Sequence, residues 1–257
     1  MARYRKLTEA QALRYSRQIF LPGFDVTGQK RLLCANALVV GIGGLGCAAA
    51  QYLVAAGVGR VTLVDADCVE ASNLQRQILF SEDDVGKPKV RVAKKRLTAL
   101  NPDVSIQAIE TRLGRDQADG MIAGVDVVLD CTDNLATRGM LNRISFQHKK
   151  PLVSGAAIRT EGQLMVFTYG RGEPCYACVS HLFGEQELAC MEAGVLSPVV
   201  GVIGALQAVE ALKILTAFGT PMTSAMLHYD ALTGVFQRFV INAVKDCPVC
   251  AESRGPS

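Results

Sequence analysis

Three closely spaced glycines and an aspartate give the clearest chemical signal in this sequence. Gly41, Gly43 and Gly46 follow an apolar segment and open a helical one, in a Gly-x-Gly-x-x-Gly pattern. Such glycines let the backbone turn tightly and approach a phosphate, while the helix N-terminus offers free N–H groups to an anion. Asp65 lies 19 residues beyond Gly46, at the end of the next predicted strand, where a carboxylate can accept hydrogen bonds from ribose hydroxyls. The pattern predicts a nucleotide site, without distinguishing NAD, FAD, S-adenosylmethionine and ATP.

Charged residues after this motif favour a nucleoside triphosphate. Arg76 and Lys89 lie in the next loop and at the start of the next helix, and two cations near a phosphate site would stabilise charge on a polyphosphate. Asp133 follows an apolar strand, at the edge of the sheet where ligands bind, and a carboxylate there suits Mg²⁺. Each residue alone could be a surface ion pair or a turn cap. Together they favour triphosphate chemistry.

Two Cys-x-x-Cys pairs, Cys175 with Cys178 and Cys247 with Cys250, have the spacing of a tetrahedral four-cysteine zinc site. The 68 residues between the pairs mean that such a site would join two distant segments. Four thiolates leave no open coordination position, so this zinc would be structural. The alternatives are four unrelated thiols or a redox pair in each motif.

The elements that must position these residues alternate between strands and helices. The predicted strands cover 37–41, 60–65, 104–110, 125–130 and 151–154, and the predicted helices cover 7–20, 45–56, 87–100 and 134–148. This alternation predicts an α/β fold of the Rossmann-like type, with a mostly parallel sheet and helices on both faces.

The pattern changes after about residue 155. We expect an antiparallel strand over 162–169, a loop-like stretch over 171–195, a long helix over 199–215 and a hairpin over 225–230 and 234–241. We therefore expect one domain over 1–257. It would comprise a helical lead-in over 1–30, a nucleotide-binding core over 31–155 and an antiparallel C-terminal part over 156–257 that holds the zinc site.

Composition narrows the class of protein. The chain has 257 residues, 49% hydrophobic and 20% charged, with a net charge of +3 that is too small to argue for nucleic acid. The most apolar run, 199–215, is short for a membrane span, and Gln207, Glu210 and Lys213 interrupt it, so we expect a packed helix and no membrane association. Nine cysteines and no secretory signal favour a reducing compartment, hence a cytoplasmic location.

Three motifs resemble those of the E1-like adenylyltransferases, the ThiF/MoeB/HesA family: Gly41–Gly46, Ser72–Gln77 and Asp130–Asn134. Within that family, Ser154–Arg159 and Glu173–Tyr176 are most similar to the molybdopterin-synthase branch. The resemblance covers nearly the whole chain.

The resemblance implies an ATP-dependent reaction on a partner protein. The chain would adenylate the C-terminal glycine carboxylate of a small ubiquitin-like sulfur carrier, the MoaD-like small subunit of molybdopterin synthase. The products would be pyrophosphate and an acyl-adenylate for later thiocarboxylation in molybdenum cofactor biosynthesis. The same chemistry on a ThiS-like carrier, in thiamine biosynthesis, is the alternative. A homodimer and a separate sulfur donor are also implied, and the C-terminal part would contribute to carrier binding and dimerisation.

The resemblance also assigns residue roles. Asp133 would serve Mg²⁺ and catalysis with Arg76 and Lys89, and Arg17 would reach the site of the partner subunit. The four paired cysteines would carry zinc. Cys190 matches a loop cysteine with thioester chemistry in related enzymes, but adenylation does not require it and an incidental thiol is the alternative. The implied nucleotide-binding residues are Gly41, Gly43, Gly44, Asp65, Asp67, Ser72, Asn73, Leu74, Gln75, Arg76, Lys89, Asp133 and Asn134.

Two other functions fit the nucleotide motif alone. An NAD-linked oxidoreductase would need a hydride-handling His or Tyr, which the sequence does not offer, and it would leave Arg76 and Lys89 unexplained. A non-catalytic scaffold that binds nucleotide and a ubiquitin-like tail would need none of Asp133, Arg76 and Lys89.

Overall fold

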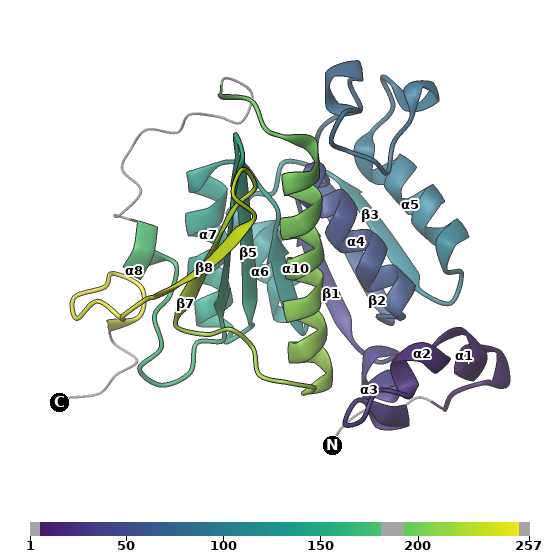
Figure 1. Cartoon of the computed structure of the whole chain (residues 1–257), viewed down its shortest axis with the longest axis horizontal. Helices are drawn as coiled ribbons and strands as arrows, with labels where there is room; N and C mark the ends of the chain where they lie inside the picture. The colour runs from purple at the N-terminus through teal and green to yellow at the C-terminus, as the bar shows by residue number, and fades with distance from the viewer. Residues whose placement is uncertain (1–5, 181–192, 252–257) are drawn as a thin grey trace.

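The computed structural model describes residues 6–180 and 193–251, and its centre is one eight-stranded sheet with the order β3-β2-β1-β4-β5-β6-β7-β8 (Figure 1). The first five strands in that order are parallel, and β6, β7 and β8 join them antiparallel, so the predicted mostly parallel sheet is confirmed. The strands are β1 (Asn36–Val40), β2 (Arg60–Asp65), β3 (Ser105–Glu110), β4 (Val127–Asp130), β5 (Leu152–Ile158), β6 (Glu161–Phe167), β7 (Ala225–Asp230) and β8 (Val235–Val240).

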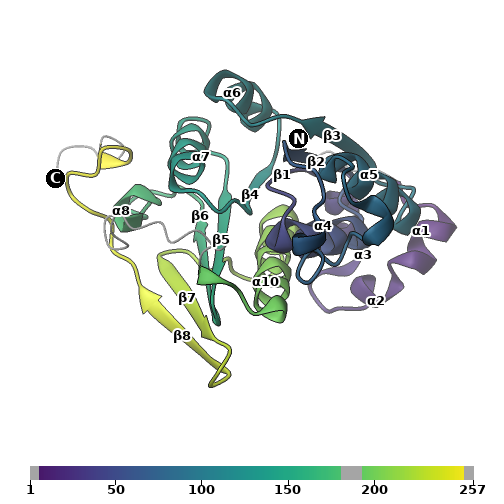
Figure 2. The same ribbon diagram turned by 90° about the horizontal axis from the view of Figure 1, so that it is seen from above.

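Helices cover both faces of the parallel strands (Figure 2). They are α1 (Glu9–Arg14), α2 (Ser16–Ile19), α3 (Asp25–Leu32), α4 (Gly44–Ala56), α5 (Lys89–Leu100), α6 (Arg115–Ala123), α7 (Leu135–Gln147), α8 (Ala177–Ser180) and α10 (Ser197–Thr216), with 3₁₀ turns η1 (Ala71–Asn73) and η2 (Glu82–Asp84). Side chains alternate along each strand, so Val39 and Leu63 pack with α4, α5 and α10, whereas Leu38 and Val64 pack with α6 and α7. This two-faced burial explains why the central strands β1 and β4 are mostly apolar, whereas β3 at the edge of the sheet alternates with polar residues.

The long apolar helix α10 is a packed core helix. Its length and composition alone would suit a membrane span, but half of its apolar stretch is buried, and it packs against α4 and β5. Gly204 permits a close contact with α4, since a Cβ at this position would lie only 2.4 Å from the carbonyl oxygen of Leu45. Gln207 is fully buried and donates to the backbone carbonyls of Asp130 and Val153, so this polar residue ties α10 to the sheet.

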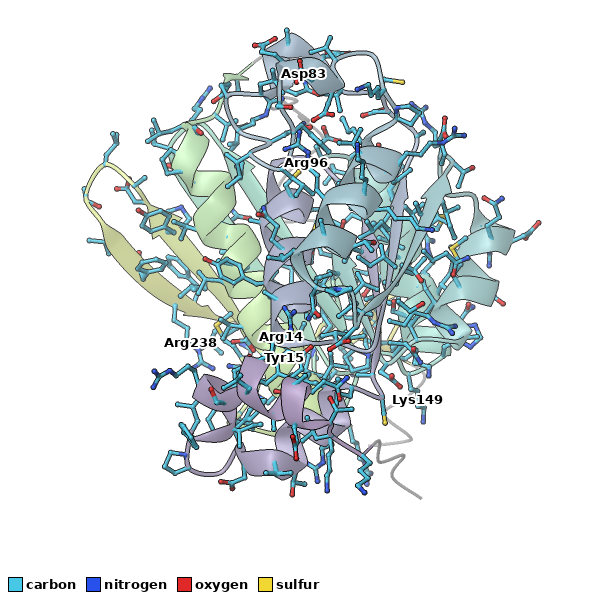
Figure 3. The ribbon with its side chains drawn as sticks, turned by 90° about the vertical axis from the view of Figure 1, so that its right-hand side faces the viewer. Arg14, Tyr15, Asp83, Arg96, Lys149 and Arg238 are labelled. Atoms are coloured by element: carbon cyan, nitrogen blue, oxygen red, sulfur yellow. The ribbon has the colours of Figure 1, made fainter. Side chains whose placement is uncertain are left out.

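The structure differs from the sequence prediction at the N-terminus. The helix expected over 7–20 is two short helices that meet at Tyr15, a buried side chain whose hydroxyl accepts a hydrogen bond from Asn101 Nδ2 at 2.8 Å (Figure 3). Thr8 caps α1, because its hydroxyl accepts a hydrogen bond from the Gln11 N–H at 3.2 Å. Helices α3 and α6 were not predicted; they are short, with 8 and 9 residues, and each contains a glycine that weakens an already brief helical pattern.

Candidate functional site

A cavity of about 760 Å³ opens at the carboxyl ends of β1, β2 and β4. The strand order reverses between β1 and β4: from β1 the sheet continues through β2 to one edge, and from β4 it continues through β5 to the other. Open α/β sheets bind ligands at such a switch point. Ten of the predicted nucleotide-binding residues line this cavity: Gly41, Gly43, Gly44, Asp65, Asp67, Asn73, Arg76, Lys89, Asp133 and Asn134.

The glycine turn forms the floor of the cavity. Gly41 has φ +88°, and a Cβ there would lie 2.7 Å from the carbonyl oxygen of Cys131. At Gly46 a Cβ would lie 1.9 Å from the carbonyl oxygen of Gly41, so only glycine allows this turn to close. Helix α4 starts at Gly44 with no side-chain cap, which leaves its N–H groups and positive dipole end available to an anion.

Asp65 connects the glycine turn to the end of β2. Its Oδ2 accepts a hydrogen bond from the Ile42 N–H at 2.6 Å, and its Oδ1 accepts one from the Asp67 N–H at 2.8 Å. Burial raises the pKa of the Asp65 carboxyl above its usual value, although these two N–H groups lower it. The carboxylate therefore holds the turn and still lines the cavity.

The two predicted cations lie at the cavity wall, each bonded within the chain. Lys89 is 5% exposed, and its Nζ lies 2.9 Å from Oδ2 of Asp67, a side chain that is 63% exposed. Arg76 is half-buried, and its Nη1 donates to the carbonyl oxygen of Ser72 at 3.1 Å. The ion pair that was one interpretation of Lys89 thus exists, and it holds a buried ammonium at the cavity wall.

Asp133 and Asn134 lie on the exposed loop between β4 and α7. Asn134 caps α7, because its Oδ1 accepts a hydrogen bond from the Thr137 N–H at 2.8 Å. Asp133 and Thr132 both line the cavity.

A buried network of hydrogen bonds, which was not predicted from the sequence, holds the loop between β4 and α7 in place. Asp130 is fully buried and accepts hydrogen bonds from the Thr132 hydroxyl at 2.7 Å and the Ser154 hydroxyl at 2.9 Å. Arg138, 6% exposed, places Nε 3.4 Å from Oδ2 of Asp130, and its Nη2 donates to the carbonyls of Thr132 at 2.7 Å and Gly155 at 3.1 Å. This network fixes the backbone immediately before Asp133.

Four of the residues predicted for the nucleotide site and its catalysis do not line the cavity. Ser72 donates its hydroxyl to Glu70 at 3.2 Å, Leu74 packs against the core, and the backbone carbonyl of Gln75 accepts a hydrogen bond from Ser197. Arg17 is exposed and lies beside Gln18, whose Nε2 donates to Ala56 at the C-terminal end of α4.

Arg17 is therefore remote from the glycine turn of its own chain. Helix α4 has 13 residues, which separates its ends by roughly 18 Å. In Figure 3, Arg14 and Tyr15 lie with the N-terminal helices in the lower half of the view, whereas Asp83 lies at the top. The role of Arg17 in a partner's site stays a prediction, and Cys190 lies outside the described residues.

Several polar cavity residues were not predicted as ligand contacts: Glu70, Gln77, Thr111, Arg112, Thr132 and Thr137. Thr111 and Arg112 follow the end of β3, and a general rule about carboxyl ends of strands would have found them. Gln77 closes the Ser72–Gln77 motif, so its signal was present in the sequence.

The two cysteine pairs meet on the face of the sheet that carries α7 and α8. All four Sγ atoms are buried and lie within 4.8 Å of one another, with Cys175 and Cys247 at 3.6 Å and Cys178 and Cys250 at 3.4 Å. A tetrahedron of metal–sulfur bonds of about 2.3 Å has edges of about 3.8 Å, so the cluster has the dimensions of a metal site.

Polar groups donate to two of these sulfur atoms, although burial raises the pKa of the Cys175 thiol well above its usual value. Asn142 Nδ2 donates to Sγ of Cys175 at 3.6 Å, and the Val244 N–H donates to Sγ of Cys178 at 3.4 Å. Burial opposes ionisation of Cys247, but the N–H groups of Cys250 and Val249 lower the pKa of its thiol to about 7. Thiolates are the form that binds metal.

Comparison with known proteins agrees with this geometry. The ThiF family model matches residues 15–249. Molybdopterin-synthase adenylyltransferase of Salmonella typhimurium is 51% identical over 247 residues, which is 96% of this chain and 99% of that protein. Sulfur carrier protein ThiS adenylyltransferase of Escherichia coli is 43% identical over 247 residues, which is 96% of this chain and 98% of that protein.

A solved structure supports the fold. The crystal structure of E. coli MccB with ATP superposes with a TM-score of 0.80 over 92% of this chain and 73% of that chain, at 24% identity. The family model spans most of the chain, and both relatives align over almost their whole length. The chain therefore belongs to the ThiF family.

Proposed function

We propose that this chain is an ATP-dependent adenylyltransferase that activates the C-terminal glycine carboxylate of a small ubiquitin-like sulfur carrier. One observation carries the proposal: a single cavity brings together the glycine turn, Asp65, Arg76, Lys89 and Asp133. The first two suit an adenosine phosphate, and the last three suit a reaction at that phosphate. Relatives named as adenylyltransferases over nearly the whole chain support it.

The proposed reaction is a displacement at the α-phosphorus of ATP. A carboxylate oxygen of the carrier forms the new bond to phosphorus, the bond to the bridging oxygen breaks, and pyrophosphate leaves with that electron pair. The carrier carboxylate is ionised at neutral pH and needs no general base. The chain therefore contributes placement and stabilisation of charge.

The cavity residues divide these tasks. The N–H groups at the start of α4 hold phosphate oxygens, and Asp65 accepts the ribose hydroxyls. Lys89 and Arg76 exchange their present partners, Asp67 and the Ser72 carbonyl, for phosphate oxygens. Asn73 lies with them in the wall, while Ser72, Leu74 and Gln75 shape the loop that presents it.

Two metal ions belong to the proposal. Asp133, with Asn134 beside it, would hold Mg²⁺, which offsets negative charge on the phosphates. The buried four-cysteine cluster would hold a structural Zn²⁺ that ties 175–178 to 247–250. Cys190 has no required role in adenylation.

The remaining assignments concern partners. We propose a cytoplasmic homodimer in which Arg17 reaches the site of the other protomer, because it lies too far from its own. The preferred carrier is a MoaD-like small subunit of molybdopterin synthase, with a separate protein as the sulfur donor. The relative named as a ThiS adenylyltransferase makes a ThiS-like carrier the second candidate.

Pyrophosphate exchange into ATP tests the function. We expect exchange that depends on Mg²⁺ and on a carrier ending in Gly-Gly, with a MoaD-like carrier more efficient than a ThiS-like one. A carrier without its last glycine is the control. Absence of carrier-dependent exchange with both carriers would sink the assignment, and greater efficiency with the ThiS-like carrier would reverse the choice of partner.

A further inference from the structure

Gln77 is a buried glutamine whose side chain is not explained by the fold. It is 4% exposed, and its Oε1 has no hydrogen-bond partner among the residues that the structure describes. Leaving a buried polar atom unpaired destabilises the folded state. A leucine or methionine would fill the same space without that cost, so packing does not account for an amide here.

The position of the amide points into the nucleotide site. Gln77 lines the cavity, and its Nε2 lies 3.7 Å from the point where a Cβ on Gly43 would be. Gly43 is the N-cap of α4, immediately before the free N–H groups of the helix. The side-chain amide therefore faces the same space as the anion-binding end of α4.

The backbone around Gln77 keeps it in that position. The N–H groups of both Arg76 and Gln77 donate to the carbonyl of Asn73, at 3.1 and 2.9 Å. This turn directs the cationic side chain of Arg76 and the neutral amide of Gln77 to one cavity wall. Gln77 adds a hydrogen-bond donor there without adding charge.

We propose that Gln77 is a phosphate-binding residue that donates its side-chain N–H to a phosphate oxygen of the nucleotide. The assignment rests on the proposed function, because it requires a nucleotide at the glycine turn. Because the donor Nε2, and not the acceptor Oε1, lies beside Gly43, the side chain can donate to the phosphate from its present position. An amide N–H bonded to an anionic phosphate is a charge-assisted hydrogen bond, which is stronger than a neutral one.

The test compares Gln77→Leu with wild type in two measurements on the full-length protein: the melting temperature without nucleotide, and the affinity for ATP and for adenosine by calorimetry. We expect the melting temperature to stay the same or rise, because an unpaired buried amide is removed. ATP affinity should fall about tenfold or more, whereas adenosine affinity should not change. Gln77→Glu should lose still more ATP affinity, since a carboxylate repels phosphate.

Gln51→Leu is the matched control. Gln51 lies on α4 away from the cavity and donates its amide to the Cys47 carbonyl at 3.0 Å, so this variant should keep wild-type ATP affinity. A lower melting temperature with unchanged ATP affinity in Gln77→Leu would show a packing role and overturn the proposal, as would an equal loss for ATP and adenosine. If wild type itself does not bind ATP, the proposed function fails with it.

Discussion

The buried pair of Asp130 and Arg138 gives the sharpest prediction about how the chain holds the loop that carries Asp133. In Arg138→Met, the fully buried Asp130 carboxylate loses its only cation within 4 Å among the described residues, and the carbonyls of Thr132 and Gly155 lose a donor. Removal of one partner from a buried pair costs about 3–5 kcal/mol. At about 2–4 °C per kcal/mol for a chain of this size, the melting temperature should fall by roughly 6–20 °C.

A second substitution separates the effect of the buried Asp130 charge from the effect of the lost Arg138 side chain. Asp130→Asn removes the uncompensated charge, so the double variant with Arg138→Met should be more stable than the sum of the two single losses predicts, by about 0.5–3 kcal/mol. Arg143→Met is the control, because Arg143 is exposed on the same helix and should change stability by less than about 0.5 kcal/mol.

Urea unfolding and thermal melting of the four variants measure these terms. Because Arg138 fixes the backbone before Asp133, pyrophosphate exchange should also fall in Arg138→Met under conditions where the variant is fully folded. The reasoning is refuted if Arg138→Met costs less than about 1 kcal/mol, or if the two substitutions are strictly additive.

Three further predictions concern the site and the cysteine cluster. Asp133→Ala should melt like wild type and lose adenylation by about a hundredfold or more, and unchanged turnover would remove Asp133 from its role. Cys250→Ser should lower the zinc content and the melting temperature together, and full zinc with a buried serine would contradict a four-thiolate site. Burial raises the pKa of Asp65, so its stabilising effect on the fold is present below the usual pKa of 3.8 and is lost as the pH rises through the raised value. ATP affinity should depend on pH in the opposite direction, because ATP binding uses the ionised carboxylate of Asp65. The affinity of wild type for ATP should weaken as the pH falls through the raised pKa, whereas that of Asp65→Asn should not. Calorimetry at several pH values would check this difference.

The strands, the nucleotide turn and the cysteine cluster were predictable because each is a local pattern or a fixed spacing. Apolar strands that end in Asp65 and Asp130 indicate a buried parallel sheet. Ligands bind at the carboxyl edge of such a sheet, so Gly41, Arg76 and Asp133 could be predicted to line one site before their packing was known.

The remaining features depend on tertiary contacts. Arg138 is eight residues from Asp130 in sequence and reads as an ordinary helix-surface arginine until α7 packs on the sheet. Gln207 reaches the β4 backbone only because α10 returns across it. At the break between α1 and α2, Tyr15 is held by a hydrogen bond from Asn101, 86 residues away.

The most direct test of adenylation is transfer of the nucleotide to the carrier. The chain, Mg²⁺, a Gly-Gly-ended carrier and ATP labelled at the α-phosphate should yield a carrier that holds the label as AMP, lost again when pyrophosphate is added. Label at the γ-phosphate should appear only in pyrophosphate. A carrier that gains γ-label, or gains none from either position while ATP is consumed, would contradict adenylation of a carrier carboxylate.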